Sequence, residues 1–290
     1  MASTPRQPRY HGQAPAKSHI IGLGHSGLGM TGSALPGSDL GKLLLQRKMD
    51  RGEVLQYTES IAEQVLTASR VMDSCNFAKV GTRDLRLMAE LYDQIFFDSR
   101  LLSLASRHGL TFRWSSRMTS AGGKTTRTTV RQRLTGEKKI SYEIALSATL
   151  LFHSFSDLQR PIRVTGYLCH NRMQAMQRIL EHELIHLGEM LVWDDSNCAA
   201  GRFQNIAGRL FGHTEHKHDL VTQQERAAKN FNVRIGEMVT FQLEQRRYIG
   251  RVNRITRRAT VLVADARGQL YGDGKRYSKF YVPISQLSKV

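Results

Sequence analysis

His182-Glu183-Leu184-Ile185-His186 carries two imidazoles four residues apart, with a carboxylate directly after the first. On a helix, side chains at positions i and i+4 rise from the same face about 5–6 Å apart, so both rings can reach one metal ion. Glu183 then lies beside the metal position, where a carboxylate can serve as a general base. The pattern is typical of a hydrolytic zinc site; the alternative is a helix with a solvated stripe of His and Glu.

The flanking residues predict a core-packed helix from Met173 to Val192. At about 100° per residue, His182, His186 and Glu189 fall within about 40° of one another, on one edge of that helix. The sequence Asp194-Asp195-Ser196-Asn197 should end the helix. Apolar residues recur at three- and four-residue spacing, as on a helix that faces a core: Met176, Ile179, Leu180, Leu184, Leu187 and Leu191.

The length and the net charge of the chain limit the classes of protein to which it can belong. Its 290 residues fit a catalytic core of about 150 residues with a smaller module and a tail. The formal net charge of +17 favours association with polyanions, most often nucleic acid and less often an anionic membrane surface. The alternative is a basic protein whose charge only aids solubility.

The cysteines and the hydropathy indicate a reducing, intracellular setting. Cys75, Cys169 and Cys198 are odd in number and form no C-x-x-C pair, which argues against a disulfide framework and against a zinc ribbon. No apolar run approaches the ~18 residues of a membrane span, and residues 1–40 lack the pattern of a secretory signal. We expect a cytoplasmic protein without a membrane partner, and association with a nucleoid or with chromatin stays open.

The N-terminal half predicts an arm followed by helices. Residues 1–42 are rich in Gly, Ser, Pro and basic residues without a period, which indicates a disordered basic arm. Residues 43–82 form a helical segment, with a pair of helices between Leu43 and Met72 that breaks at Asp50-Arg51-Gly52. An amphipathic helix from Arg83 to Arg100 should pack under the site helix.

The middle of the chain, residues 83–220, predicts an α+β core. Three β-patterned stretches lie at Thr111–Trp114, Thr125–Leu134 and Lys139–Leu146, between the amphipathic helix and the site helix. We expect these strands to form a short antiparallel sheet. The sheet can supply one wall of the cleft, with an edge strand that aligns an extended peptide.

The C-terminal residues predict a second, basic module. A helical connector at 221–232 leads to five short strands within 233–290, which indicate a small β-barrel. The module holds 12 Lys and Arg and 4 Asp and Glu, so its net charge is +8. We expect salt-sensitive, phosphate-driven binding, while the alternative is a stabilising appendage with a solvated charged face. The candidate nucleic-acid-binding residues are Arg246, Arg247, Arg254, Arg257, Arg258, Lys275 and Arg276.

Residues 85 to 220 resemble the SprT-like family, which includes the Spartan proteases. The segment Gly201-Arg202-Phe203 resembles the family's helix after the site loop, and His213-Thr214 through His218 resembles its exit. Further similar segments precede the HExxH block: Leu91-Tyr92-Asp93, Phe97-Asp98, Trp114-Ser115-Ser116-Arg117-Met118-Thr119, Ala121-Gly122, Ile140-Ser141 and Leu146-Ser147. The C-terminal module resembles an SH3-like or KOW-like barrel and stands where the family usually has a cysteine-bearing zinc module.

The resemblance implies a zincin-like core and a zinc endopeptidase that acts on DNA-bound or DNA-crosslinked proteins. It makes His182 and His186 ligands of a zinc ion, Zn2+, and Glu183 the general base. Family members usually place a third His before the segment that matches Gly201-Arg202-Phe203, whereas this chain offers Cys198. The competing candidates for the third ligand are Glu189, His213, His216 and His218. Alternatively, Glu189 does not bind the metal but accepts a hydrogen bond from a metal ligand and orients it.

Two functions of different classes therefore remain. The first is a zinc-dependent endopeptidase of SprT-like type whose substrates are proteins associated with nucleic acid, with DNA favoured over RNA. The second is a non-catalytic nucleic-acid-binding protein with a degenerate protease core. Convergence of a third ligand on His182 and His186 distinguishes them, and the sequence leaves the oligomeric state open.

Overall fold

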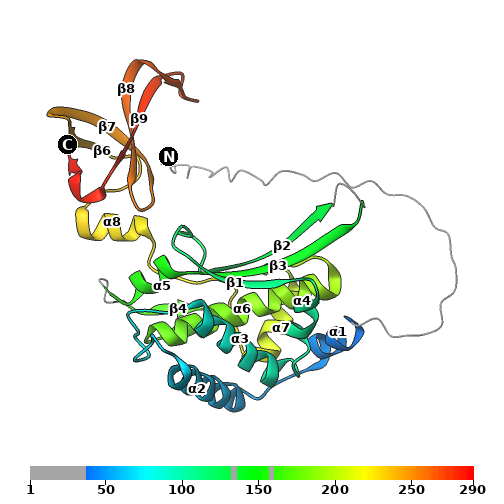
Figure 1. Cartoon of the computed structure of the whole chain (residues 1–290). Helices are drawn as coiled ribbons and strands as arrows, with labels where there is room; N and C mark the ends of the chain where they lie inside the picture. The colour runs from blue at the N-terminus through cyan, green and yellow to red at the C-terminus, as the bar shows by residue number, and fades with distance from the viewer. Residues whose placement is uncertain (1–36, 132–135, 157–159) are drawn as a thin grey trace, which may run out of the picture. The chain divides into compact units, whose positions relative to one another are not determined.

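The computed structural model describes residues 37–131, 136–156 and 160–290 (Figure 1). Most of the predicted arm lies outside the described residues. Within them, the protein is a mixed α+β structure, and no helix combines the length and the apolar character needed to cross a membrane.

The first helix that packs in the core begins before residue 43, earlier than the sequence predicted. Helix α1 (Gly37–Gln46) buries Leu40 and Leu44 completely, so the predicted end of the arm at residue 42 is wrong. The leucines at positions 40, 43 and 44 follow helical spacing, which gives α1 a core-facing side. The predicted break between two helices is confirmed, but it ends at Asp50: Arg51 and Gly52 already belong to helix α2 (Arg51–Ala68), which Asp50 caps by accepting a hydrogen bond from the Gly52 amide.

The helix predicted from Arg83 to Arg100 is wrong in its extent. The observed helix α3 (Thr82–Phe96) ends before the predicted end, and a separate helix, α4 (Leu101–Arg107), begins just after it. Asp98 and Ser99 adopt positive φ angles between them, which ends the first helix. The buried Asp93 carboxylate accepts hydrogen bonds from the amides of Leu101 and Leu102, so a residue of α3 caps α4.

The sheet of the core is mixed, not antiparallel as predicted. Strand order is β1-β3-β2, with β1 (Leu110–Ser115) parallel to β3 (Lys138–Ser147) and β2 (Gly123–Arg131) antiparallel to β3. The chain passes from β1 to the far edge and returns through the β2–β3 hairpin, which places β3 in the middle. Apolar alternation reports which face of a strand is buried and carries no information on strand direction, which is why the sequence did not reveal this arrangement.

The predicted site helix is confirmed as α6 (Arg172–Trp193), which begins after its cap Asn171 and ends at Asp194 in the left-handed conformation. The three-stranded sheet lies along one side of α6, and helix α3 crosses the other (Figure 1). Along the chain, β3 is followed by helix α5 (Ala148–Ser154) and by a hairpin of β4 (Ile162–Val164) and β5 (Tyr167–Cys169), which precede α6. Helix α7 (Gly201–Phe211) follows α6.

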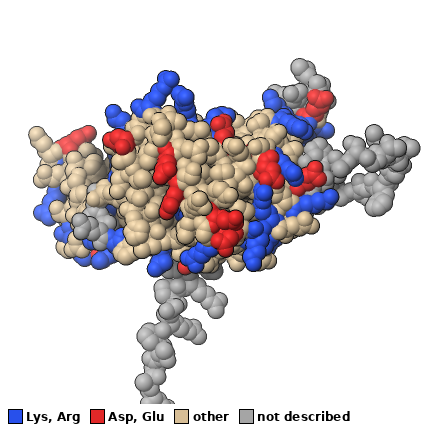
Figure 2. All heavy atoms as spheres, turned by 90° about the horizontal axis from the view of Figure 1, so that it is seen from below, with Lys and Arg blue, Asp and Glu red and all other residues tan. Residues whose placement is uncertain are grey.

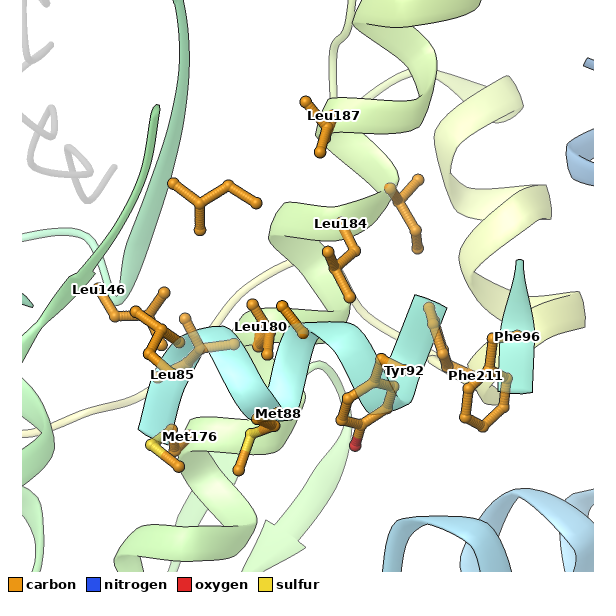
Figure 3. Packing of buried hydrophobic residues seen from close by; sticks show 14 of the residues in the cluster. Leu85, Met88, Tyr92, Phe96, Leu146, Met176, Leu180, Leu184, Leu187 and Phe211 are labelled. Atoms are coloured by element: carbon orange, nitrogen blue, oxygen red, sulfur yellow. The ribbon is translucent and has the colours of Figure 1, made fainter. Parts of the chain in front are cut away.

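The apolar side of α6 forms the centre of the core. Leu180 and Leu184 pack against Leu85 and Met88 of α3, and all four side chains are completely buried (Figure 3). The aromatic ring of Phe211 from α7 extends this packing toward the end of α3. The predicted apolar stripe therefore fixes the helix, and with it the direction in which its polar edge points.

The C-terminal residues form a five-stranded antiparallel sheet that is not closed. Strand order is β10-β6-β7-β8-β9, so the five predicted strands are present, but among the described residues the edge strands β10 and β9 do not pair and the predicted small barrel is not closed. One face packs its own core around Val239, Phe241 and Val261. The elements are α8 (Gln223–Phe231), β6 (Met238–Leu243), β7 (Arg246–Ile255), β8 (Ala259–Leu270), β9 (Arg276–Val282), a 3-10 turn (Ile284–Gln286) and β10 (Ser288–Lys289).

Candidate metal centre

The polar edge of α6 opens into a cavity of about 570 Å³. The start of β2 supplies one wall, through Gly123 and Thr125, as expected for an edge strand beside the site. The loop between α6 and α7, the segment after α7, the loop before β2 and the end of β4 also line the cavity. His182, Glu183 and His186 all line this cavity.

The two imidazoles face each other. Nε2 of His182 and Nε2 of His186 lie 3.1 Å apart, so both can reach one point. The buried ring of Phe203 from α7 packs against both, with centroids 4.7 Å and 4.5 Å away. Burial lowers the pKa of His182 to about 3 and that of His186 to about 4, which keeps both rings in the neutral form that binds metal.

Cys198 completes a group of three potential ligands. Its Sγ and one ring nitrogen each of His182 and His186 all lie within 4.8 Å of one another, and no other such group occurs among the described residues. Two imidazoles and a thiolate are a donor set that suits zinc, which is bound by four ligands in a tetrahedron and can keep one position for water. The residues present therefore fit the metal that the motif implies.

The other candidates for the third ligand have other partners. Glu189 is completely buried and is held by Ser196 and Arg202. Nε2 of His213 lies 2.8 Å from the buried carboxylate of Glu181. His218 lines the cavity, and its Nε2 accepts a hydrogen bond from the Gly122 amide. His216 lines the cavity as well but is not part of the group.

Glu183 is buried between α6 and β2. The Thr125 hydroxyl donates a hydrogen bond to its Oε2 over 2.8 Å. Burial raises the pKa of Glu183 to about 7 against the opposing effect of the hydrogen bonds from Thr125. A carboxylate with a pKa near neutrality can both accept and return a proton at physiological pH, which is what a general base of hydrolysis requires.

Gly123 allows this close approach of β2 to α6. A Cβ added at Gly123 would lie 2.6 Å from Oε1 and 2.7 Å from Cγ of Glu183. The sequence pattern placed Thr125 at the start of a predicted strand, and it singled out neither Gly123 nor Thr125 as a site residue. Their proximity to Glu183 depends on the packing of β2 on α6, so no local pattern could have revealed it.

A buried polar network lies behind the site. The Glu181 carboxylate accepts hydrogen bonds from Arg178 (2.9 Å) and from the Tyr92 hydroxyl (2.7 Å), and contacts His213. Burial alone would raise the pKa of Glu181, but Arg178 and His213 lower it below its usual value. The network joins α3, α6 and the end of α7, so it fixes the backbone on which His182 stands.

The seven predicted nucleic-acid-binding residues do not form one cluster. Arg247 and Arg254 lie on the exposed face of the five-stranded sheet, opposite the face that packs the module core. This outer face also carries residues that the sequence analysis did not select: Ile249, Arg251, Lys279 and Tyr281. The two-residue alternation of Arg247, Ile249 and Arg251 in one strand was the signal that could have found them.

The other five predicted residues are exposed but lie elsewhere in the module. Arg257 and Arg258 occupy the turn between β7 and β8, and Lys275 and Arg276 lie at the turn before β9. Arg246 opens β7. On the face of the protein drawn in Figure 2, acidic and basic side chains are interspersed, without a field of one sign.

Comparison of this chain with protein-family models, with curated proteins and with solved structures finds no match.

Proposed function

We propose that this protein is a zinc-dependent endopeptidase of SprT-like type that cleaves proteins associated with nucleic acid, including DNA-protein crosslinks. The observation that carries the proposal is the convergence of His182, His186 and Cys198 within 4.8 Å, in a cavity that Glu183 also lines. A degenerate protease core that binds no metal would not require three metal-binding side chains and a carboxylate to lie together. The non-catalytic alternative is therefore the less favoured function.

The chemistry follows from the residues around the cavity. His182, His186 and Cys198 would hold a zinc ion, which would supply the Lewis acidity needed to activate water and polarise the scissile carbonyl. Glu183 takes the proton of the attacking water and returns it to the leaving amine, a role suited to its pKa of about 7. The Thr125 hydroxyl holds the Glu183 carboxylate in place.

The edge of the sheet offers a place for the peptide. Among the described residues, β2 pairs only with β3, which leaves its other edge open, and its first residues, Gly123, Lys124 and Thr125, line the cavity. An extended chain can add to such an edge through main-chain hydrogen bonds, which give affinity without requiring a particular sequence. This arrangement supports an endopeptidase with broad sequence tolerance.

The decisive experiment measures metal content and cleavage together. The purified protein is expected to retain about one zinc ion per chain and to cleave a DNA-binding protein, faster in the presence of single-stranded DNA. The Glu183→Gln variant should keep the zinc and lose cleavage, while Glu90→Gln, at an exposed position of α3, should retain both. Equal cleavage by the native protein and Glu183→Gln would remove Glu183 from the mechanism. Absence of zinc in the native protein would leave the nucleic-acid-binding alternative.

The basic module is the proposed means of reaching the substrate. Its net charge of +8 and the cations of the outer face favour the phosphate backbone of DNA, which is recognised by charge without base readout. Tyr281 and Ile249 are exposed on the same face and can contact bases of an unpaired strand.

A further inference from the structure

We infer that Ser196 and Glu189 form a relay that sets the tautomer of His186 and thereby its ability to bind the metal. The inference rests on the proposed zinc site and assigns positioning roles to two residues outside the group of ligands. Ser196 lies in the loop after α6, and its Oγ is 2.7 Å from Nδ1 of His186 and 2.6 Å from Oε2 of Glu189. The three groups thus form one continuous chain of hydrogen bonds.

The direction of each hydrogen bond follows from a count of protons. A serine hydroxyl has one proton, and a carboxylate only accepts hydrogen bonds. The Ser196 proton is therefore directed to Glu189, and the Ser196 oxygen must accept from His186. It follows that His186 carries its proton on Nδ1 and has a free electron pair on Nε2, the atom that faces His182 and is needed to bind a metal ion.

The far end of the relay is fixed by a cation. Arg202 of α7 donates from Nε to Oε1 of Glu189 over 2.6 Å, while Ser196 uses the other carboxylate oxygen. The Arg202 guanidinium also lies 4.5 Å from the ring of Trp193 at the end of α6. Because Glu189 is completely buried, this pairing keeps its carboxylate in one orientation toward Ser196.

The other imidazole has no such support. Nδ1 of His182 is buried and has no hydrogen-bond partner among the residues that the structure describes. Since His186 Nε2 carries no proton, the 3.1 Å contact between the two rings has His182 Nε2 as its donor in the metal-free chain. His186 is therefore the pre-oriented ligand of the pair, and the relay acts on it alone.

A first test needs neither metal nor activity. In the metal-free native chain, nitrogen chemical shifts of labelled histidine are expected to show His186 protonated on Nδ1, with the resonances assigned by the His186→Gln variant. Ser196→Ala should lose this preference, and Ser196→Thr, which retains the hydroxyl, should keep it. A native His186 that carries its proton on Nε2 would overturn the relay.

A second test measures zinc affinity by competition with a chelator. Ser196→Ala is expected to bind zinc roughly 10–100-fold more weakly than the native chain, the usual effect of losing a partner of a metal-bound histidine. Ser196→Thr should restore the affinity. Ser103→Ala, a matched change at an exposed position of α4, should leave it unchanged.

Coupling between the two residues separates a relay from two independent structural effects. Because Glu189 acts through Ser196, the double variant Glu189→Gln/Ser196→Ala should bind zinc no more weakly than Ser196→Ala alone. Additive losses would contradict the relay, as would an unchanged affinity in Ser196→Ala while the native chain binds zinc and cleaves protein. A native chain that binds no zinc would overturn both the relay and the proposed function.

Discussion

At the scale of single residues, the candidate site depends on tight packing between neighbouring groups, which leaves no room for additional atoms. Glu183 is held between α6 and β2 only because position 123 has no side chain. Phe203 in the same way fills the space under both imidazoles. Substitutions at such positions test the site without changing any group that takes part in the chemistry.

We expect Gly123→Ala to lower both stability and cleavage. The added methyl group would lie 2.6 Å from the Glu183 carboxylate, so either β2 or Glu183 must shift, at a cost of about 1–3 kcal/mol in the free energy of unfolding. Urea denaturation and the cleavage assay measure the two effects. Gly201→Ala is the control for stability, because nothing lies within 4 Å of its added Cβ and Ala is favoured in a helix. A Gly123→Ala variant as stable and active as the native chain would show that the approach is not needed.

The identity of the third ligand can be tested in the same way. Cys198→Ala should weaken zinc binding by more than the roughly 10–100-fold expected for loss of an outer partner, because it removes a direct ligand. Cys75→Ala, which removes an exposed thiol distant in sequence from Cys198, should have no effect on zinc affinity. Full zinc affinity in Cys198→Ala would exclude Cys198 and direct attention to His216 and His218, which line the same cavity.

At the scale of elements, α6 is positioned by two different kinds of contact. Its apolar side packs on α3 through Leu180 and Leu184, and its polar residue Glu181 ties it to Tyr92 and His213. The apolar packing supplies most of the stability, because it removes large side chains from water. The Glu181 network adds direction, since its hydrogen bonds are satisfied in only one arrangement of the helices.

Loss of Glu181 is expected to be strongly destabilising. Glu181→Ala leaves the buried Arg178 cation without its carboxylate partner, which typically costs about 3–5 kcal/mol in the free energy of unfolding. Chemical denaturation measures this loss. Glu90→Ala, on the exposed side of α3, should change stability by less than about 0.5 kcal/mol. A loss as small for Glu181→Ala would show that the network is solvated and contributes little.

At the scale of the whole molecule, the chain joins a candidate metal site with a strongly basic module. The module has its own apolar core, so substitutions on its outer face should not disturb the α+β core that carries the candidate site. Arg247, Arg251 and Arg254 from one strand stand on that face, and a row of cations along a strand suits the repeating phosphates of a nucleic acid.

Replacement of Arg247, Arg251 and Arg254 by Ala should weaken binding of single-stranded DNA and make it less sensitive to salt. If each contacts one phosphate, the slope of log affinity against log salt should become shallower by about 2. Fluorescence anisotropy at several salt concentrations measures the slope. Replacement of Arg70, Lys79 and Arg83, which are exposed outside the module, removes the same charge and should leave the slope nearly unchanged. Equal effects of the two triple variants would show that net charge alone governs binding.

The sequence by itself determined the features that depend on local geometry. The spacing of His182 and His186 and the apolar stripe on the same helix were enough to predict α6 and the pairing of the two rings, because helical periodicity is a property of neighbours along the chain. Only the tertiary structure decided the direction of β1, the open edge of the C-terminal sheet, and which of five candidates joins the histidines. Each of these depends on segments that are not neighbours along the chain: the loop after α6 brings Cys198 to the rings and Ser196 to Glu189, and side-chain type alone does not encode where a loop places its residues.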